Sequence, residues 1–149
     1  MRVVLQSVLH ASVRGPNIPE TKTIGRGVIV YVGFSNNDDE VLNNAVTTFA
    51  KKLPSLKLFA DEHGKLSQSL TDIQGDVLII SNFTIRWRNH KGASLDFSRA
   101  ASYDRANHFY TCLVEAVKQY IPTVQTGVFG AHMLIESTVD GPVNLVLDV

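Results

Sequence analysis

The sequence predicts an α+β protein with a mostly antiparallel β-sheet or barrel-like core and two main helices. Three observations favour this class. Several short runs are rich in β-branched and aliphatic residues, two stretches repeat apolar residues at helical spacing, and glycine, proline and polar residues separate them. Five or more strands carrying two helices form a layered architecture around a hydrophobic core. We therefore expect one domain over residues 1–149.

The strands are expected in the following order. Residues 2–13 (RVVLQSVLHASV) form an opening strand, and residues 14–25, with two prolines and two glycines, form a turn or an irregular hairpin tip. Residues 26–34 are a near-continuous apolar run, typical of a strand covered on both faces. A short strand at 56–60 precedes a turn, and residues 75–85 (GDVLIISNFTI) form the third strong strand. The remaining strands lie within residues 123–139 and 143–149.

Two helices complete the prediction. Residues 35–40 (SNNDDE) supply N-cap candidates and acids for a first helical turn, and Pro54 ends that helix. Its apolar positions at helical spacing are Leu42, Ala45, Val46, Phe49 and Leu53. The second helix has an apolar stripe over about five turns. That stripe consists of Tyr103, Ala106, Tyr110, Leu113, Val117 and Ile121.

Composition narrows the function classes. Hydrophobic residues are 44% and charged residues 19% of the 149, which is typical of a globular chain. Fourteen basic and fourteen acidic residues cancel, so any RNA contact must come from a local patch, and we expect no DNA partner. A single cysteine excludes a disulfide framework and a thiolate zinc site. No apolar run approaches membrane-spanning length, so we expect no membrane contact and a cytoplasmic location. Separately, nothing in the sequence requires a metal, and we expect no cofactor.

Recognisable catalytic motifs are few. The sequence has no G-x-S-x-G elbow, P-loop or H-E-x-x-H motif. Ser81, Asn82 and Thr84 crowd the end of one strand, where alternation would place Asn82 and Thr84 on one face and Ser81 and Phe83 on the other. From these residues alone, polar side chains where a strand leaves the core are favoured over a polar pocket floor.

A basic segment with a tryptophan follows this strand. Residues 86–92 (RWRNHKG) contain Arg86, Arg88 and Lys91. Phosphate contact with base stacking is one interpretation, and a solvated loop is the other.

Near the end of the chain, Gly141-Pro142 precedes an apolar strand, which indicates a hairpin turn or a turn with a functional role.

From end to end, the chain resembles the D-aminoacyl-tRNA deacylase family. The resemblance rests on collinear segments: RVVLQSVLHASV, IGRGVIVYVGF, LKLFADEHGKLSQSL, GDVLIISNFTI at the family's Ser-Gln-Phe-Thr-Leu, KGASLDFSRAA, TGVFGAHM, and DGPVNLVLDV at its Asn-x-Gly-Pro-Val-Thr. It implies the family's fold and a homodimer. It also implies a cis Gly141–Pro142 bond whose turn enters the partner's site and rejects L-residues.

The resemblance implies a chiral proofreading hydrolase that cleaves the ester of D-aminoacyl-tRNA, and of glycyl-tRNA mischarged on tRNA-Ala. The tRNA's own terminal 2′-hydroxyl would assist, while backbone N–H groups stabilise the oxyanion. The catalytic residues implied are Ser81 and Thr84. The substrate-binding residues implied are Asn82, Phe83, Phe129, Gly130, Ala131, Met133, Gly141 and Pro142.

Four positions depart from the family's motifs. Asn82 replaces a glutamine, Ser7 an arginine, Val139 an asparagine and Asn144 a threonine. The alternative interpretation is therefore a divergent homologue that binds tRNA without hydrolysing it.

Overall fold

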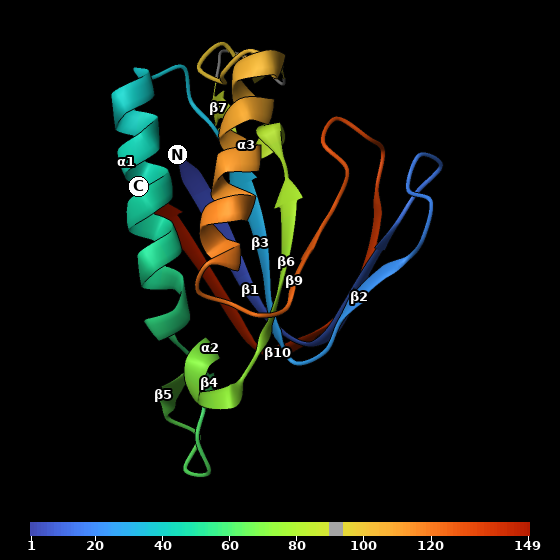
Figure 1. Cartoon of the computed structure of the whole chain (residues 1–149), viewed down its shortest axis with the longest axis vertical. Coiled ribbons are helices and arrows are strands. Elements are labelled where there is room, and N and C mark those ends of the chain that lie inside the picture. Colours follow the sequence, from blue (N-terminus) through green and yellow to red (C-terminus); the bar gives the residue numbers. More distant parts are fainter. Residues whose placement is uncertain (90–93) are drawn as a thin grey trace.

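A six-stranded sheet forms the centre of the computed structural model, which describes residues 1–89 and 94–149 (Figure 1). Its strands are β1 (Arg2–Arg14), β2 (Lys22–Ile24), β3 (Gly27–Gly33), β6 (Asp76–Ser81), β9 (Val124–Thr126) and β10 (Leu134–Asp148). They are ordered β10-β1-β3-β6-β9, and β2 also pairs with β1. β1 is antiparallel to β2, β3 and β10, which confirms the predicted class. β6 is parallel to both β3 and β9.

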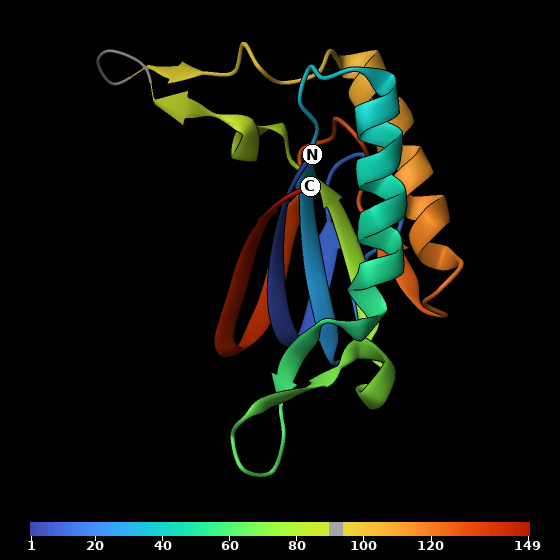
Figure 2. The same cartoon turned by 90° about the vertical axis from the view of Figure 1, so that its left-hand side faces the viewer.

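The parallel section arises because two helices connect its strands. Adjacent parallel strands need a crossover that returns the chain to the same end of the sheet. The path from β3 to β6 includes α1 (Asp39–Lys52), and the path from β6 to β9 includes α3 (Tyr103–Lys118). Both helices lie side by side on one face of the sheet (Figure 2).

The two helices follow the predicted pattern, with one exception. Every predicted apolar position of α1 is buried, and Pro54 lies in the short 3₁₀ helix η1 (Leu53–Ser55) that follows it. On α3 the stripe is buried at its centre and end, where Leu113 and Val117 have no exposed surface. Tyr103 departs from the stripe, with 63% of its surface exposed, because it stands at the first residue of the helix, beyond the end of the sheet.

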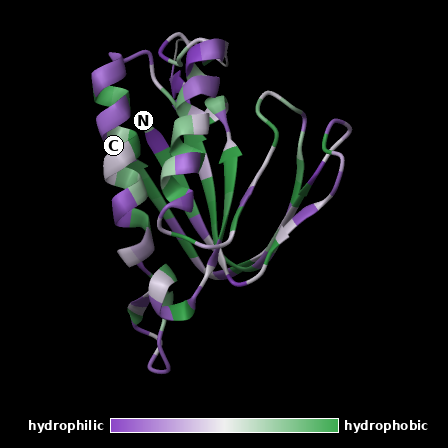
Figure 3. Cartoon of the chain, in the orientation of Figure 1, coloured by the Kyte–Doolittle hydropathy of each residue, from purple (hydrophilic) through white to green (hydrophobic). Residues whose placement is uncertain are grey.

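The core has two clusters, one on each face of the sheet. Val77 and Ile79 of β6 face the helices, while Leu78 and Ile80 face a second cluster with residues of β1 and β3. The curled β1, β2 and β10 cover this second cluster and nearly close the sheet (Figure 1). Both faces of β3 and β6 are thus apolar, which explains their continuous hydrophobic runs (Figure 3).

Small elements decorate the two ends of the sheet. One end carries a hairpin of β4 (Lys57–Ala60) and β5 (Leu66–Ser69), followed by α2 (Leu70–Ile73). At the other end, η2 (Phe83–Arg86), β7 (Arg88–Asn89) and β8 (Leu95–Asp96) form an arm that projects from the body (Figure 2). The strand predicted for 75–85 therefore ends at Ser81, and the predicted alternation beyond it is wrong because η2 is helical.

The C-terminal strand contains a bulge instead of a hairpin turn. β10 runs antiparallel to β1 on both sides of Gly141–Pro142, with Val139 opposite Val8 and Asn144 opposite Gln6. Residues 140–143 therefore stand opposite Ser7 alone. Gly141 has φ +122°, and a Cβ there would lie 2.7 Å from the nitrogen of Val143, so this position requires glycine. The hairpin interpretation is wrong, whereas the expected cis Gly141–Pro142 bond is present.

Within the described residues, no helix is both long enough and apolar enough to cross a membrane.

Candidate active site

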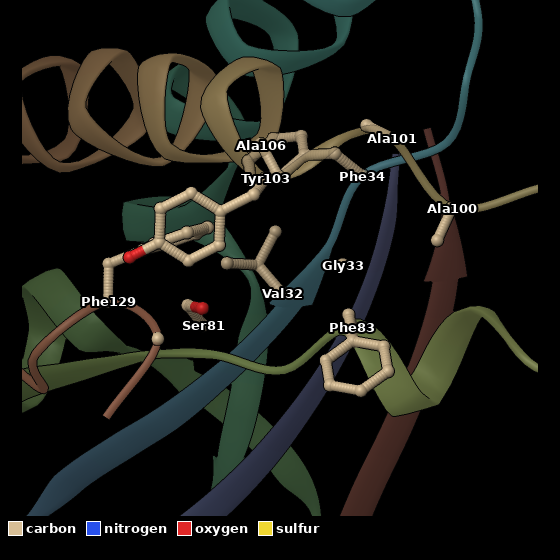
Figure 4. A pocket seen from close by; sticks show the side chains of 11 residues that line it. Val32, Gly33, Phe34, Ser81, Phe83, Ala100, Ala101, Tyr103, Ala106 and Phe129 are labelled. Atoms are coloured by element: carbon tan, nitrogen blue, oxygen red, sulfur yellow. The ribbon is translucent and has the colours of Figure 1, made fainter. Parts of the chain in front are cut away.

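Two adjoining cavities lie at the carboxyl ends of the parallel strands β3 and β6. The first, here called the helix-side chamber, has a volume of about 320 Å³ (Figure 4). Its lining residues are Val32, Gly33, Phe34, Ser81, Phe83, Ala100, Ala101, Tyr103, Ala106, Phe129 and Gly130. The second, the strand-side chamber, has a volume of about 290 Å³. Its lining residues are Tyr31, Ile80, Ser81, Asn82, Phe83, Gly130, Ala131, His132, Met133 and Ile135. Ser81, Phe83 and Gly130 border both chambers.

The structure brings most predicted site residues to these chambers. Those that line one or both are Ser81, Asn82, Phe83, Phe129, Gly130, Ala131 and Met133. Thr84 lines neither chamber, and Gly141 and Pro142 lie elsewhere in the same chain. Of the three polar residues considered for a pocket floor, the structure places Ser81 and Asn82 at the chambers and Thr84 outside both. Their roles in binding and catalysis stay predictions.

Ser81 ends β6, and its hydroxyl faces the helix-side chamber (Figure 4). His132 is exposed and lines the strand-side chamber, and no hydrogen bond joins it to Ser81. A serine nucleophile is normally activated by a base within hydrogen-bonding reach. This geometry therefore lacks the direct Ser–His contact of a nucleophile–base pair. Neither chamber has the three His, Cys, Asp or Glu side chains that would suggest a metal site, and no such group occurs in the described ranges.

The Asn82 side chain turns back on its own segment. Its Oδ1 accepts the backbone N–H of Thr84 at 3.0 Å and also the Thr84 hydroxyl, so Asn82 caps η2. The backbone N–H of Asn82 donates to Val32 O at 2.8 Å. Among residues 82–84, the N–H groups of Asn82 and Thr84 thus have hydrogen-bond acceptors. For the Phe83 N–H, the described part of the chain supplies no acceptor. Phe83 itself borders both chambers, just beyond the end of β6.

The wall opposite Ser81 is the loop over residues 127–133, which two tyrosines hold in place. Phe129 packs against Tyr103, with 5.0 Å between ring centroids, and against Tyr110 at 5.7 Å. The buried hydroxyl of Tyr110 donates to Ile79 O at 2.9 Å, and burial raises the pKa of Tyr110. Gly127 N–H donates to the same carbonyl at 3.0 Å. The loop is thus anchored to β6, the strand that also carries Ser81.

Several lining residues are not evident from the sequence. Val32 and Phe34 could have been found from the parallel pairing of β3 with β6, since adjacent parallel strands open at the same edge. Tyr103 shares the spacing of a core stripe, which conceals its place at the chamber. The spacing of the histidines gives no signal that would single out His132.

Two of the three predicted basic residues, Arg86 and Arg88, are engaged within the chain. The Arg86 side chain is 16% exposed and lies 3.3 Å from Asp148, while Arg88 pairs with Asp96. Lys91 lies outside the described residues. Arg2 also binds Asp148, with 2.9 Å between charged atoms, and its hydrogen bond lowers the pKa of that carboxyl. Arg86 therefore helps to hold the end of β10, and RNA contact by these residues stays a prediction.

Gly141 and Pro142 are exposed, and they border a different cavity of about 360 Å³ with Leu58, Ala60 and Leu66. Ser7, 3% exposed, donates its hydroxyl to Asp140 O at 2.6 Å and so fastens the bulge. Ser7 of β1 pairs with Val28 of β3, and Ser81 of β6 pairs with Val32, four residues further along β3. In the order of the sheet, β10 lies three strands from β6. This corresponds to roughly 13 Å along the strands and 14 Å across them. One small substrate cannot contact both places in a single chain.

These observations define a class of site: a pair of mainly apolar chambers that share Ser81, Phe83 and Gly130, built on a mixed sheet with two crossover helices. The comparisons with known proteins specify it further. The family model described as D-Tyr-tRNA(Tyr) deacylase matches residues 4–148, and the chain belongs to this family.

Individual relatives agree over nearly the whole chain. A D-aminoacyl-tRNA deacylase of Thermosipho africanus is 39% identical over 99% of this chain and 97% of its own length. One of Bacillus pumilus is 39% identical over 99% and 98%. A solved structure titled c-Myc DNA Unwinding Element Binding Protein has a TM-score of 0.85 and 34% identity, over 100% of this chain and 99% of its own. A probable eukaryotic D-amino acid tRNA deacylase, TM-score 0.86 and 20% identical over 99% and 98%, shares the fold.

Proposed function

We propose that this protein hydrolyses the ester bond between a D-amino acid and tRNA, releasing free D-amino acid and tRNA. The observation that carries the proposal is the convergence of two distant segments on one pocket. Residues 81–83 and 129–133, both resembling family motifs, line the same pair of chambers. A cytoplasmic location, where aminoacyl-tRNA is used, is part of the proposal.

The chemistry proposed for this site is positioning with oxyanion stabilisation. The ester carbon would lie at the junction of the chambers, where the Phe83 N–H can donate to the carbonyl oxygen as it gains negative charge. The Ser81 hydroxyl would orient the substrate. Water would attack the ester carbon, and the adjacent 2′-hydroxyl of the terminal adenosine would assist the transfer of a proton to the departing 3′-oxygen, so that free D-amino acid and tRNA are released. This suits a site without a Ser–His contact.

Stereochemical selection is proposed to require two copies of the chain. Gly141–Pro142 lies too far from Ser81 to serve its own pocket, so it would enter the pocket of a partner and exclude L side chains. The edge strand β10 supports such pairing because it exposes apolar residues, including 63% of Val146 and 38% of Val139. Glycyl-tRNA would be accepted, since glycine has no side chain to exclude. Sedimentation showing only monomer at micromolar concentration would refute this arrangement.

The deacylation test uses D-tyrosyl-tRNA and L-tyrosyl-tRNA charged on the same tRNA. We expect ester loss from the D form alone, and a reduced rate for Ser81→Ala. Ser137→Ala, at an exposed position of β10, is the matched serine control. Equal rates for both enantiomers would contradict the chiral part of the proposal, and no acceleration of either would refute hydrolysis. A tRNA ending in 2′-deoxyadenosine should react far more slowly if RNA supplies the assisting hydroxyl.

A second candidate function is tRNA binding without hydrolysis. The capping geometry of Asn82 favours it, because both Asn82 Oδ1 and the Thr84 hydroxyl are occupied by each other. This candidate predicts tRNA binding that leaves the D-aminoacyl ester intact.

The basic arm provides the proposed RNA contact. Arg88→Glu and Lys91→Glu should weaken tRNA binding and lower its salt dependence, by about one unit of slope for each phosphate that the variant no longer neutralises. The control is Lys118→Glu, which lies at the last residue of α3 and outside the arm. An unchanged slope would mean that the arm is only solvated surface. Arg86 is a poorer test because its reversal would break the pair with Asp148 at the end of β10, whereas the pair of Arg88 with Asp96 lies within the arm itself.

A further inference from the structure

Tyr103 spans the mouth of the helix-side chamber. It is the first residue of α3, and its ring lies over the chamber on the side opposite Phe83 (Figure 4). The ring meets Phe129 nearly edge-on, at an interplanar angle of 75°. Nevertheless, 63% of the residue is exposed. The chamber mouth therefore presents an accessible aromatic surface.

Gly130 makes room for this ring. A Cβ at position 130 would lie 2.7 Å from the Tyr103 hydroxyl oxygen and 2.8 Å from its Cε2. Gly130 also has φ +72°, a conformation that side-chain-bearing residues rarely adopt. Tyr103 thus occupies space that exists because residue 130 has no side chain. Contact with Phe129, which Tyr110 supports from below, fixes the ring in this place.

The chamber offers little other polar side-chain chemistry. Its lining is hydrocarbon apart from the hydroxyls of Ser81 and Tyr103. Within the described part of the chain, the Tyr103 hydroxyl has no hydrogen-bond partner, whereas that of Tyr110 has one. An accessible aromatic face beside an available hydroxyl suits a flat ring that has a polar edge.

We propose that Tyr103 binds the substrate directly. Its ring stacks on a flat aromatic group entering the helix-side chamber, and its hydroxyl bonds to the polar edge of that group. The inference rests on the proposed function, since aminoacyl-tRNA has two sources of such a group. One is the terminal adenine base, and the other is an aromatic amino-acid side chain. Tyr103 is then a specificity-determining residue of this chain.

The test measures binding of two analogues that cannot be hydrolysed. D-Tyrosine and D-alanine are each joined by an amide bond to 3′-amino-3′-deoxyadenosine, and their Kd values are measured by calorimetry. Tyr103→Ala should weaken binding about tenfold because stacking is removed, and Tyr103→Phe about threefold because the hydroxyl bond is removed. The control is Tyr120→Ala, which removes an exposed tyrosine just beyond the other end of α3.

The pattern of losses identifies the ring that Tyr103 contacts. Equal weakening of both analogues by Tyr103→Ala assigns adenine, and weakening of the D-tyrosine analogue alone assigns the amino-acid side chain. Unchanged Kd values for both, or no binding of either by the wild type, overturn the inference. If Tyr103→Ala does not fold, Tyr103→Leu keeps apolar contact with Phe129 without a flat face. Wild-type protein that binds the analogues but cleaves no D-aminoacyl-tRNA refutes the proposed function alone.

Discussion

Ser7→Ala removes the hydrogen bond that fastens the Gly141–Pro142 bulge to the sheet. The Ser7 hydroxyl is buried and donates to Asp140 O at 2.6 Å, opposite the four residues of β10 that leave the ladder. Alanine keeps the strand geometry and the packing of β1, so the variant isolates this single hydrogen bond. We expect the bulge to become mobile while the rest of the sheet stays folded.

The expected cost in stability is small. A neutral hydrogen bond contributes about 1 kcal/mol to the free energy of unfolding, and the cost is greater when its acceptor becomes buried without a partner. Asp140 is only half-buried, so water can replace the hydroxyl and the lower figure applies. For a chain of this length, that corresponds to a fall of about 2–4 °C in Tm.

The effect on selectivity should be larger than the effect on stability. If the bulge enters a partner's pocket, a displacement of about 1 Å can lower the reaction rate by up to about 100-fold. The assay compares kcat/KM for D- and L-tyrosyl-tRNA, and the ratio of D to L should fall. Ser12→Ala, at a half-buried position of the same strand, is the control. A lower Tm with an unchanged ratio of D to L would refute the assignment of the bulge to the site.

Three further predictions concern single side chains. Asn82→Gln should remove the cap of η2 and raise the single-turnover deacylation rate. An unchanged rate would contradict the idea that the shorter Asn82 side chain limits hydrolysis. The bond from Arg2 keeps the pKa of Asp148 low in the folded state, so it stabilises the fold above about pH 4 and this stabilisation disappears as the pH falls through the lowered pKa. Asp148→Asn should therefore have a lower Tm than wild type at pH 7, and this difference should shrink as the pH is lowered. A difference that does not shrink would contradict this. Tyr110→Phe removes the bond to Ile79 O and should cost about 1 kcal/mol in chemical denaturation, whereas unchanged stability would show that the bond contributes nothing.

Elements with a clear periodicity were predictable from the sequence. The continuous apolar run of β3 and the helical stripe of α1 each reflect burial that the residues themselves encode. The change from strand to 3₁₀ helix after Ser81 was not predictable from alternation, because it depends on the local bond between Asn82 and Thr84. Apolar periodicity cannot distinguish a core residue from one at a pocket mouth, so it could not place Tyr103 correctly.

The candidate site was predictable only in part, for a similar reason. The resemblance to family motifs identified Ser81 and Phe129, which the structure brings to one pocket. It could not show that the Asp-Gly-Pro segment is a bulge in one strand, because turn residues have the same signature in both settings. Only the pairing of β10 with β1, which tertiary structure sets, distinguishes a bulge from a hairpin turn.

The pairing of β1 with β10 has a consequence for how the chain is made. Arg2 is aligned with Asp148, so β1 finds this partner only after all the residues between the two strands have been synthesised. Until then one edge of β1 is open, and helices α1 and α3 can form against the sheet before the fold is complete. Contacts so distant in sequence slow folding. The bulge carrying Gly141–Pro142 is therefore among the last of these elements to take its place in the sheet.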